Sequence, residues 1–149
     1  NVEILGYNSR LDTIQAAILL VKLNHLEEFN RRRQAIARFY SAELAHLPGV
    51  VVPGYSAGHV FHQFTIRCRN RDRLAARLRE LGIATMVYYP VPLHRMKVFE
   101  GRCRINGPLT QTERACQEVL SLPIEPLLEP WELERVVQAF REAMETIDN

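Results

Sequence analysis

Residues 9–47 read SRLDTIQAAILLVKLNHLEEFNRRRQAIARFYSAELAHL and contain neither glycine nor proline. The pattern predicts one long helix that begins near Arg10, with Ser9 and Asp12 as a capping box, and that ends at Pro48-Gly49. A straight helix of this length would span about 55 Å, whereas a domain of this size has a diameter of roughly 40 Å. We therefore expect the helix to be kinked or to reach beyond its own domain.

Between Leu11 and Leu26 this helix is apolar on nearly every side, with Asp12, Lys22 and His25 as its chargeable residues. A helix that is apolar all round is buried all round, and the rest of the chain is too short to cover both sides. We interpret one side as the contact surface for a missing domain or a second subunit. The alternative is a central helix wrapped by its own domain.

The residues after this helix predict a small sheet covered by helices. Strands are expected at 50–52, 60–68, 85–89 and 122–124, and helices at 70–82, 110–120 and 130–147. Asn70 and the Thr110/Glu113 pair are the expected caps, and Gly82 is the expected residue after a helix end. The predicted fold class is α+β and the predicted unit covers 1–149. Residues 1–47 hold the long helix and the segment before it, and residues 48–149 form a small α+β domain with a mixed or antiparallel sheet.

The composition narrows the class of protein. The chain has 149 residues, of which 47% are hydrophobic and 24% charged, as in an ordinary globular domain. The net charge of +2 is too balanced to indicate nucleic-acid binding, and no apolar run approaches the roughly 20 residues of a membrane span. Three cysteines without a Cys-x-x-Cys pair favour a reducing, cytoplasmic location. Because the chain starts at Asn1, we expect a trimmed start or a piece of a longer protein.

Two segments are candidate binding sites. Gly6-Tyr7-Asn8-Ser9-Arg10 precedes the long helix, where free N–H groups, the Asn8 amide and the Arg10 guanidinium could hold an anion; ordinary helix capping is the alternative. Tyr88-Tyr89-Pro90-Val91-Pro92-Leu93-His94 places two phenols and an imidazole on a proline-stiffened loop, which is typical of a pocket wall. The alternative is an aromatic pair over the core with a surface histidine.

No metal site is expected. His59 and His62 are three residues apart in a predicted strand, so their side chains point to opposite faces and cannot readily share an ion. Arg31-Arg32-Arg33 has no interleaved aromatic residues and is interpreted as a solvated helix face.

Four motifs occur in one order along the chain. They are Gly6-x-Asn8-x-Arg10-Leu11 with Ile14-Gln15-Ala16-Ala17, then His59-Val60-Phe61-His62-Gln63-Phe64, then Gly82-Ile83 with Tyr88–His94, and finally Leu120-Ser121-Leu122-Pro123. In this order and spacing they resemble the C-terminal domain of the DegT/StrS sugar aminotransferases. These are pyridoxal-phosphate (PLP) enzymes of the aspartate aminotransferase fold.

The resemblance implies that the chain is the C-terminal part of a longer enzyme. The N-terminal domain would carry the lysine that forms the Schiff base with PLP, and neither Lys22 nor Lys97 lies in a similar context. No catalytic residue is therefore expected in this chain, and the piece alone is not expected to be active. The amino donor would be glutamate or glutamine, and the acceptor a keto sugar that is usually nucleotide-linked.

The resemblance also implies roles for particular residues. Asn8 would reach across a homodimer interface to the cofactor phosphate of the partner subunit, and Arg10 would brace that loop. Tyr88, Tyr89 and His94 would line the sugar side of the site. His62 and Gln63 would support the sheet.

Two alternatives remain open at this stage. Some relatives replace the Schiff-base lysine with histidine and dehydrate sugars with the aminated cofactor, and that position lies outside this chain. The chain could also be an α+β regulatory or protein-binding module with no chemistry.

Overall fold

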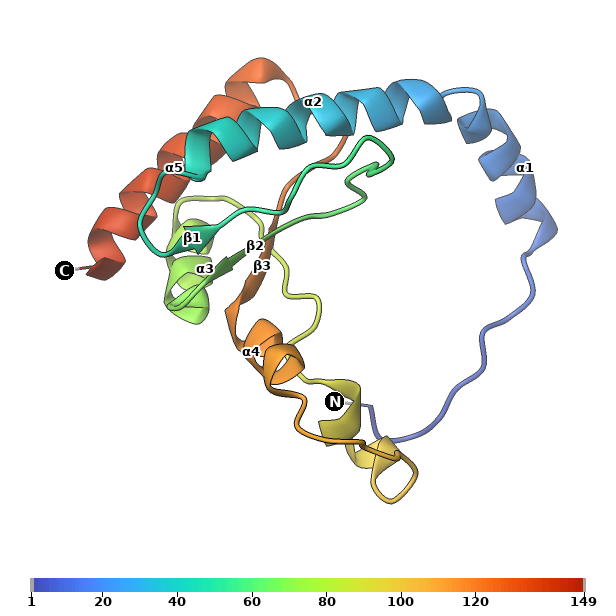
Figure 1. The fold of residues 1–149 in the computed structure, drawn as a ribbon. Coiled ribbons are helices and arrows are strands. Elements are labelled where there is room, and N and C mark those ends of the chain that lie inside the picture. The colour runs from blue at the N-terminus through green and yellow to red at the C-terminus, as the bar shows by residue number, and fades with distance from the viewer. Residues whose placement is uncertain (1, 149) are drawn as a thin grey trace.

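The computed structural model describes residues 2–148, so both ends of the predicted 1–149 unit, Asn1 and Asn149, lie outside it. Five helices and three strands occupy the described residues (Figure 1). In chain order they are α1 (Thr13–Leu23), α2 (Leu26–Leu44), β1 (Val50–Val51), β2 (Phe64–Cys68), α3 (Arg71–Glu80), α4 (Thr110–Glu118), β3 (Val119–Leu122) and α5 (Pro130–Asp148). Two short 3-10 turns, Leu93–Arg95 and Lys97–Phe99, lie between α3 and α4.

The sheet of the described residues has the strand order β1-β2-β3, and both pairings are antiparallel. Phe64 pairs with Leu122, and Val50 pairs with Cys68. Phe64, Ile66 and Cys68 alternate with less buried neighbours, as expected of a strand with one face in the core. The predicted α+β class, with a small antiparallel sheet and helices around it, is thus confirmed.

The core lies between the sheet and the helices α2, α3 and α5. Tyr40, Phe64, Leu78 and Phe140 are fully buried in it, each from a different element. Burial of large apolar side chains is the main stabilising term here, at about 1.5–3 kcal/mol for each one. The periodic apolar residues of 130–147 therefore form the buried face of α5, as their spacing predicts.

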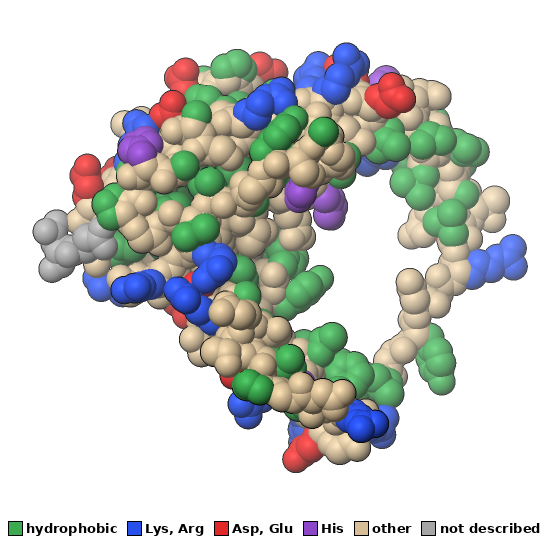
Figure 2. Space-filling model, viewed as in Figure 1, with side chains coloured by type: hydrophobic (Ala, Val, Ile, Leu, Met, Phe, Trp, Pro, Cys, Tyr) green, Lys and Arg blue, Asp and Glu red, His purple; other side chains and the backbone are tan. Residues whose placement is uncertain are grey.

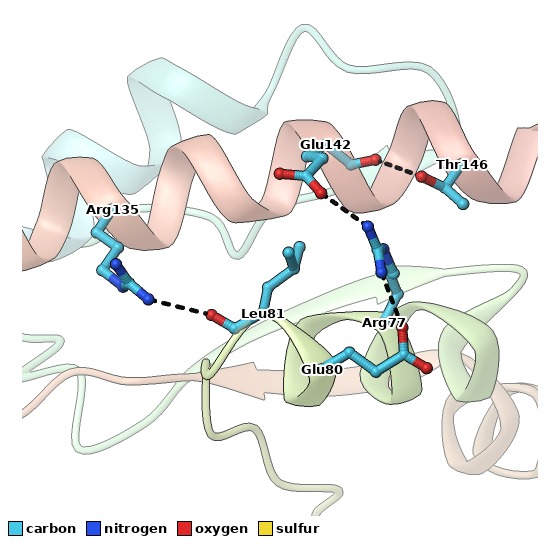
Figure 3. A network of polar contacts seen from close by, with 6 residues as sticks. All are labelled: Arg77, Glu80, Leu81, Arg135, Glu142 and Thr146. Carbon is cyan, nitrogen blue, oxygen red and sulfur yellow. Dashed lines mark hydrogen bonds and ion pairs between the residues drawn. The ribbon is translucent and has the colours of Figure 1, made fainter.

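Polar contacts tie α3 to α5 at the rim of this core (Figure 3). The Arg77 guanidinium donates to Glu80 at 2.9 Å and to Glu142 of α5 at 2.8 Å. Arg135 of α5 donates to the Leu81 carbonyl at 3.4 Å. These pairs are exposed, so they align the two helices more than they stabilise the fold.

The end of α3 follows its sequence. Gly82 has a φ of +79° directly after the last turn, a conformation that suits glycine. Its N–H donates to the Arg79 carbonyl, and the N–H of Ile83 donates to the Leu78 carbonyl at 2.8 Å. The predicted helix end at Gly82 is confirmed.

The prediction of one helix from Arg10 to Leu47 is wrong. The Asp12 carboxylate accepts the N–H of Ile14 at 2.8 Å, so Asp12 rather than Ser9 caps α1 and the helix begins at Thr13. The helix then breaks at Asn24-His25, where both backbone N–H groups bond back three residues instead of four. This tightening ends α1, and α2 begins at Leu26 in a new direction (Figure 1), so the expected kink is present.

Three further local predictions are corrected. Residues 85–89 form a single bridge, between Met86 and Ser121, instead of a strand, because Pro90 and Pro92 follow and cannot donate to a ladder. At the start of α4 the cap position is held by Leu109, and Thr110 is the first helical residue. The Asn70 side chain makes no capping hydrogen bond at the start of α3.

Two strands are shorter or shifted relative to their predictions. The alternation from Val60 extends through a turn, and the ladder of β2 starts only at Phe64. The predicted strand at 122–124 lies earlier, as β3, because α4 ends at Glu118 instead of about Leu120. Both shifts leave the order of the elements unchanged.

Helix α1 packs against very little of the described chain. Each of its residues is exposed except Ala16, which is half-buried. Leu19 is 52% exposed and Val21 63% exposed, although both are strongly apolar. The described residues thus do not wrap this helix. No helix among residues 2–148 is both long enough and apolar enough to cross a membrane.

Candidate functional site

The Asn8 and Arg10 side chains lie on an extended segment that precedes α1. Both are exposed, and within residues 2–148 neither makes a hydrogen bond or ion pair. The start of the segment, Glu3–Leu5, lies against Lys97–Arg102 (Figure 1). The amide and the guanidinium are thus free to meet a group from outside the described chain.

Tyr88 and Tyr89 follow the bridge between Met86 and Ser121 of β3. Their rings pack edge to face with centroids 5.6 Å apart. Tyr89 is 67% exposed and Tyr88 38% exposed. Exposed phenol rings of this kind have an apolar face and a polar hydroxyl, and both are suited to contact a ligand.

His94 lies in the 3-10 turn Leu93–Arg95 and lines a different pocket from Tyr88. Its side chain is 10% exposed, and its Nε2 lies 3.1 Å from Oε1 of Glu113 on α4. Arg95 donates to the same oxygen at 2.8 Å. These hydrogen bonds from His94 and then from Arg95 hold the pKa of Glu113 below its ordinary value.

A cleft of about 510 Å³ opens between the start of α2 and the edge of the sheet. Tyr88 lines it, whereas Tyr89 and His94 do not. Lys22, Arg33 and the imidazole of His62 lie on its walls. The structure therefore places one predicted site residue in this cleft and leaves Asn8, Arg10, Tyr89 and His94 outside its walls.

Lys22 and Arg33 were not predicted as cleft residues, and His62 was predicted only to support the sheet. Arg33 stood in an arginine run interpreted as a solvated face, yet its side chain is half-buried. Phe29 and Arg33 are four residues apart on α2, so they share a helix face. That spacing was the signal that distinguishes Arg33 from Arg31 and Arg32.

A second ion-pair group lies where α4 meets β3. Glu118 accepts from Arg114 at 2.8 Å and from Arg67 of β2 at 2.7 Å, and these bonds lower its pKa. The buried Arg71 donates to the carbonyls of Cys116 and Val119 beside it. This group secures the α4–β3 junction and adds no exposed reactive side chain.

The described residues bring together no group of three His, Cys, Asp or Glu side chains that could hold a metal ion. His59 is engaged locally, since its Nδ1 accepts the N–H of Phe61 at 2.9 Å. Lys22 lines the cleft, and Lys97 lies beside the N-terminal segment.

Relatives of the chain include proteins named as sugar aminotransferases and a protein named as regulatory. It is 48% identical over 94% of its length to a pleiotropic regulatory protein of Geobacillus stearothermophilus. It is 43% identical over 98% of its length to a dTDP-3-amino-3,4,6-trideoxy-alpha-D-glucose transaminase of Streptomyces venezuelae. In both comparisons the chain spans 39% of the relative's length.

Solved structures of similar sequence have the same fold as this chain. S. venezuelae DesV in complex with a ketimine intermediate matches with a TM-score of 0.84 at 43% identity, over 96% of this chain and 39% of that one. NtdA of Bacillus subtilis with bound cofactor PMP matches with a TM-score of 0.79 at 33% identity, over 97% of this chain and 35% of that one. The family described as DegT/DnrJ/EryC1/StrS aminotransferase matches residues 1–141. The chain therefore belongs to the DegT/DnrJ/EryC1/StrS aminotransferase family.

Proposed function

We propose that the longer protein of which this chain is part is a PLP-dependent transaminase, which moves an amino group from glutamate or glutamine to a nucleotide-linked keto sugar. The family match over residues 1–141 is the observation that carries this proposal. Relatives named as dTDP-sugar and UDP-sugar transaminases support the substrate class. The solved relative with bound PMP supports the cofactor.

The chemistry of the N-terminal segment fits a share in holding the cofactor phosphate. Asn8 offers amide N–H groups and Arg10 a guanidinium, both of which donate well to phosphate oxygens. Their exposure supports a role toward a cofactor held mainly by the N-terminal part of the protein. When bound, PLP supplies the electron sink of the reaction, and the residues of this chain supply orientation and charge.

The exposed face of α1 supports a homodimer in which this helix meets either the N-terminal domain or the second subunit. An apolar groove of about 570 Å³ runs along Leu19, Leu23, Leu26 and Phe29. Exposed apolar patches of this kind mark interaction surfaces. In such an assembly Asn8 reaches the cofactor of the partner subunit.

Tyr88 and Tyr89 are assigned to the sugar side of the site, and His94 to its supporting wall. The exposure of both phenols supports contact with a substrate. The nearly buried imidazole of His94, bonded to Glu113, suits a group that holds the loop carrying the tyrosines. A cytoplasmic location is part of the proposal and is supported by the free thiols of Cys68, Cys103 and Cys116.

The test uses the full-length protein loaded with PLP. Amination of a dTDP-linked or UDP-linked keto sugar is measured with glutamate and with glutamine as donor. Asn8→Ala is expected to raise the dissociation constant of PLP by about 10- to 100-fold, the range for a lost hydrogen bond to a charged group. Ser9→Ala, on the neighbouring exposed residue, is the matched control and should leave that constant unchanged.

A regulatory role is the second candidate, because one relative is named a pleiotropic regulatory protein. The same assay separates the two. A full-length protein that binds PLP but aminates none of these keto sugars would exclude the transaminase proposal. Deoxygenation of the sugar without amination would instead identify a dehydratase of the same family.

A further inference from the structure

The turn before β2 holds one residue in an unfavourable backbone conformation. Phe61 has a φ of +47°, in the left-handed region that bulky residues rarely adopt. Its ring is 1% exposed and packs against Tyr55 and Phe64, with ring centroids 6.1 and 6.4 Å away. A strained conformation persists only where its surroundings hold it, so the contacts of this turn show what holds Phe61.

His59 makes the contacts that hold the turn. Its Nδ1 accepts the backbone N–H of Phe61 at 2.9 Å, and its ring lies against the Phe61 ring with centroids 4.0 Å apart. The His59 carbonyl accepts a hydrogen bond from the Gln34 side chain of α2 at 3.0 Å, and the His59 N–H donates to the Ser56 carbonyl at 3.1 Å. His59 therefore holds Phe61 and is itself held against α2.

The residues that follow Phe61 form part of the wall of the cleft beside α2. His62 and Gln63 line this cleft, and the ladder of β2 begins at the next residue, Phe64. Figure 2 shows this side of the molecule hollowed, with histidine side chains at the rim of the hollow. Because Phe64 is fixed by its pairing with Leu122, the backbone at Phe61 determines where His62 and Gln63 lie.

The hydrogen bond to Phe61 requires a neutral imidazole. To accept at Nδ1, the His59 ring must carry its proton on Nε2. A protonated ring has an N–H on both nitrogens and no acceptor, so its Nδ1–H would point at the N–H of Phe61. Histidine is the side chain that ordinarily gains this proton between about pH 8 and 5.

No negative group packed on this turn compensates a protonated ring. On α2, Gln34 is neutral, and Arg38 lies 6.0 Å over the Tyr55 ring and donates to its hydroxyl at 3.4 Å. His62, the other histidine of the turn, lies on the cleft wall. Within residues 2–148, His59 forms no ion pair with a carboxylate. A proton gained by His59 thus costs the contact with Phe61 and gains no new partner.

We propose that His59 is a pH-sensitive positioning residue of the cleft wall. In its neutral form, with the proton on Nε2, it holds Phe61 at positive φ and so places His62 and Gln63 on the cleft. When Nδ1 takes up a proton from solvent, the Phe61 N–H loses its acceptor and the segment 59–63 is released. This inference concerns the shape of the cleft and does not depend on the proposed function.

The test is hydrogen exchange of the full-length protein at about pH 8 and about pH 5.5, corrected for the pH dependence of unprotected amides. Peptides that contain Phe61 should exchange about 10-fold faster at the lower pH, the effect of one lost hydrogen bond. In His59→Asn the amide oxygen can accept the same N–H and does not titrate, so protection should persist at both pH values. In His59→Ala exchange should be fast at both. His46→Asn, on an exposed histidine after α2, is the matched control and should respond as the parent does.

Three results would overturn the inference. The first is equal protection of Phe61 in the parent at both pH values, and the second is an acid response that persists in His59→Asn. The third is a parallel loss of protection in α5, because the whole core would then open rather than the turn. Nitrogen NMR shifts of the His59 ring in the parent give a reading that depends on no variant. They should show a proton on Nε2 and none on Nδ1 at neutral pH, and the opposite tautomer would also exclude the proposed role.

Discussion

Nε2 of His94 and Oε1 of Glu113 lie 3.1 Å apart, although 19 residues separate them in the chain. The same carboxylate oxygen accepts two N–H groups of Arg95, at 3.0 and 2.8 Å. Glu113 thus fastens the 3-10 turn Leu93–Arg95 to the first turns of α4. The loop that carries Tyr88 and Tyr89 leads directly into this turn, so its position depends on that carboxylate.

Glu113→Gln should loosen the segment 93–109 without unfolding the core. The amide oxygen can still accept hydrogen bonds but lacks the negative charge that strengthens those from His94 and Arg95. Hydrogen exchange of the full-length protein should become faster in 93–109 and stay unchanged in β2. Glu27→Gln, on the exposed first turn of α2, is the control. Unchanged exchange in 93–109 would show that the contacts of Glu113 with His94 and Arg95 do not hold this segment in place.

Acid should weaken the contacts of Glu113 and Glu118. Their pKa values in the folded protein are lowered by hydrogen bonds from His94 and Arg95 and from Arg114 and Arg67, respectively. A lowered folded pKa contributes stability above the ordinary carboxyl value of 4.5, and that stability is lost as the pH falls through the folded value. In denaturant unfolding of the full-length protein over a pH series, the free energy of unfolding should therefore fall below about pH 4.5. This decrease should be smaller in the Glu118→Gln variant.

Tyr40→Phe should leave stability unchanged or raise it. The Tyr40 hydroxyl is buried and has no hydrogen-bond partner among residues 2–148. Burial, followed by the charge of Glu132, raises its pKa. An unsatisfied buried hydroxyl costs about 1–3 kcal/mol, which the phenyl ring avoids. Thermal unfolding of the full-length protein is the measurement, and Tyr40→Ala, which opens a cavity costing about 3–5 kcal/mol, is the comparison. A clear loss in Tyr40→Phe would show that the hydroxyl is bonded after all.

Cys68 should resist alkylation under conditions that modify Cys103. Burial raises the pKa of the Cys68 thiol to about 11, and its side chain is 4% exposed within β2. Cys103 is exposed on the loop before α4. Because the thiolate is the reactive form, maleimide labelling near neutral pH followed by peptide mass spectrometry should find Cys103 first. Equal labelling of Cys68 would mean that β2 opens readily.

Leu19→Glu should weaken the assembly of the full-length protein. Leu19 is 52% exposed on the apolar groove of α1, and a carboxylate there would have to be desolvated in any contact. Sedimentation should show a larger fraction of the smaller species. Gln15→Glu adds the same charge at an exposed polar residue of the same helix and should leave the distribution unchanged. If Leu19→Glu leaves the sedimentation distribution of the full-length protein unchanged, the interface between subunits does not include this face of α1.

The elements that the sequence predicts well are those fixed by local pattern and burial. Three features are predicted by a few neighbouring residues. They are the strand with alternating Phe64, Ile66 and Cys68, the periodic apolar face of α5, and the glycine that follows α3. A kink in the long helix was expected from its length, but its position at Asn24-His25 was not predicted, because neither residue forbids a helix. Its cause is a change of hydrogen-bonding pattern that no periodicity reveals.

The candidate site was less accessible to sequence reasoning because it depends on contacts between distant segments. The sequence pattern predicts Glu113 as part of a capping box with Thr110, whereas in the structure its carboxylate contacts His94. Lys22 and Arg33 share a cleft with His62 only because α2 crosses the edge of the sheet. The roles of Asn8 and Arg10 stay predictions, because both side chains are exposed and neither has a hydrogen-bond or ion-pair partner among residues 2–148.

Asn24 and His25, which join α1 to α2, fix the rotation of α1 about its own axis and, with it, the position of the extended segment before α1. Since an α-helix advances about 100° per residue, one residue inserted at Asn24-His25 would swing the leucines of α1 about a quarter-turn or more around its axis. The extended segment with Asn8 would be carried along with them. The joint thus determines where the Asn8 side chain lies relative to the rest of the fold. An insertion there would leave every side chain unchanged and would still displace the Asn8 amide.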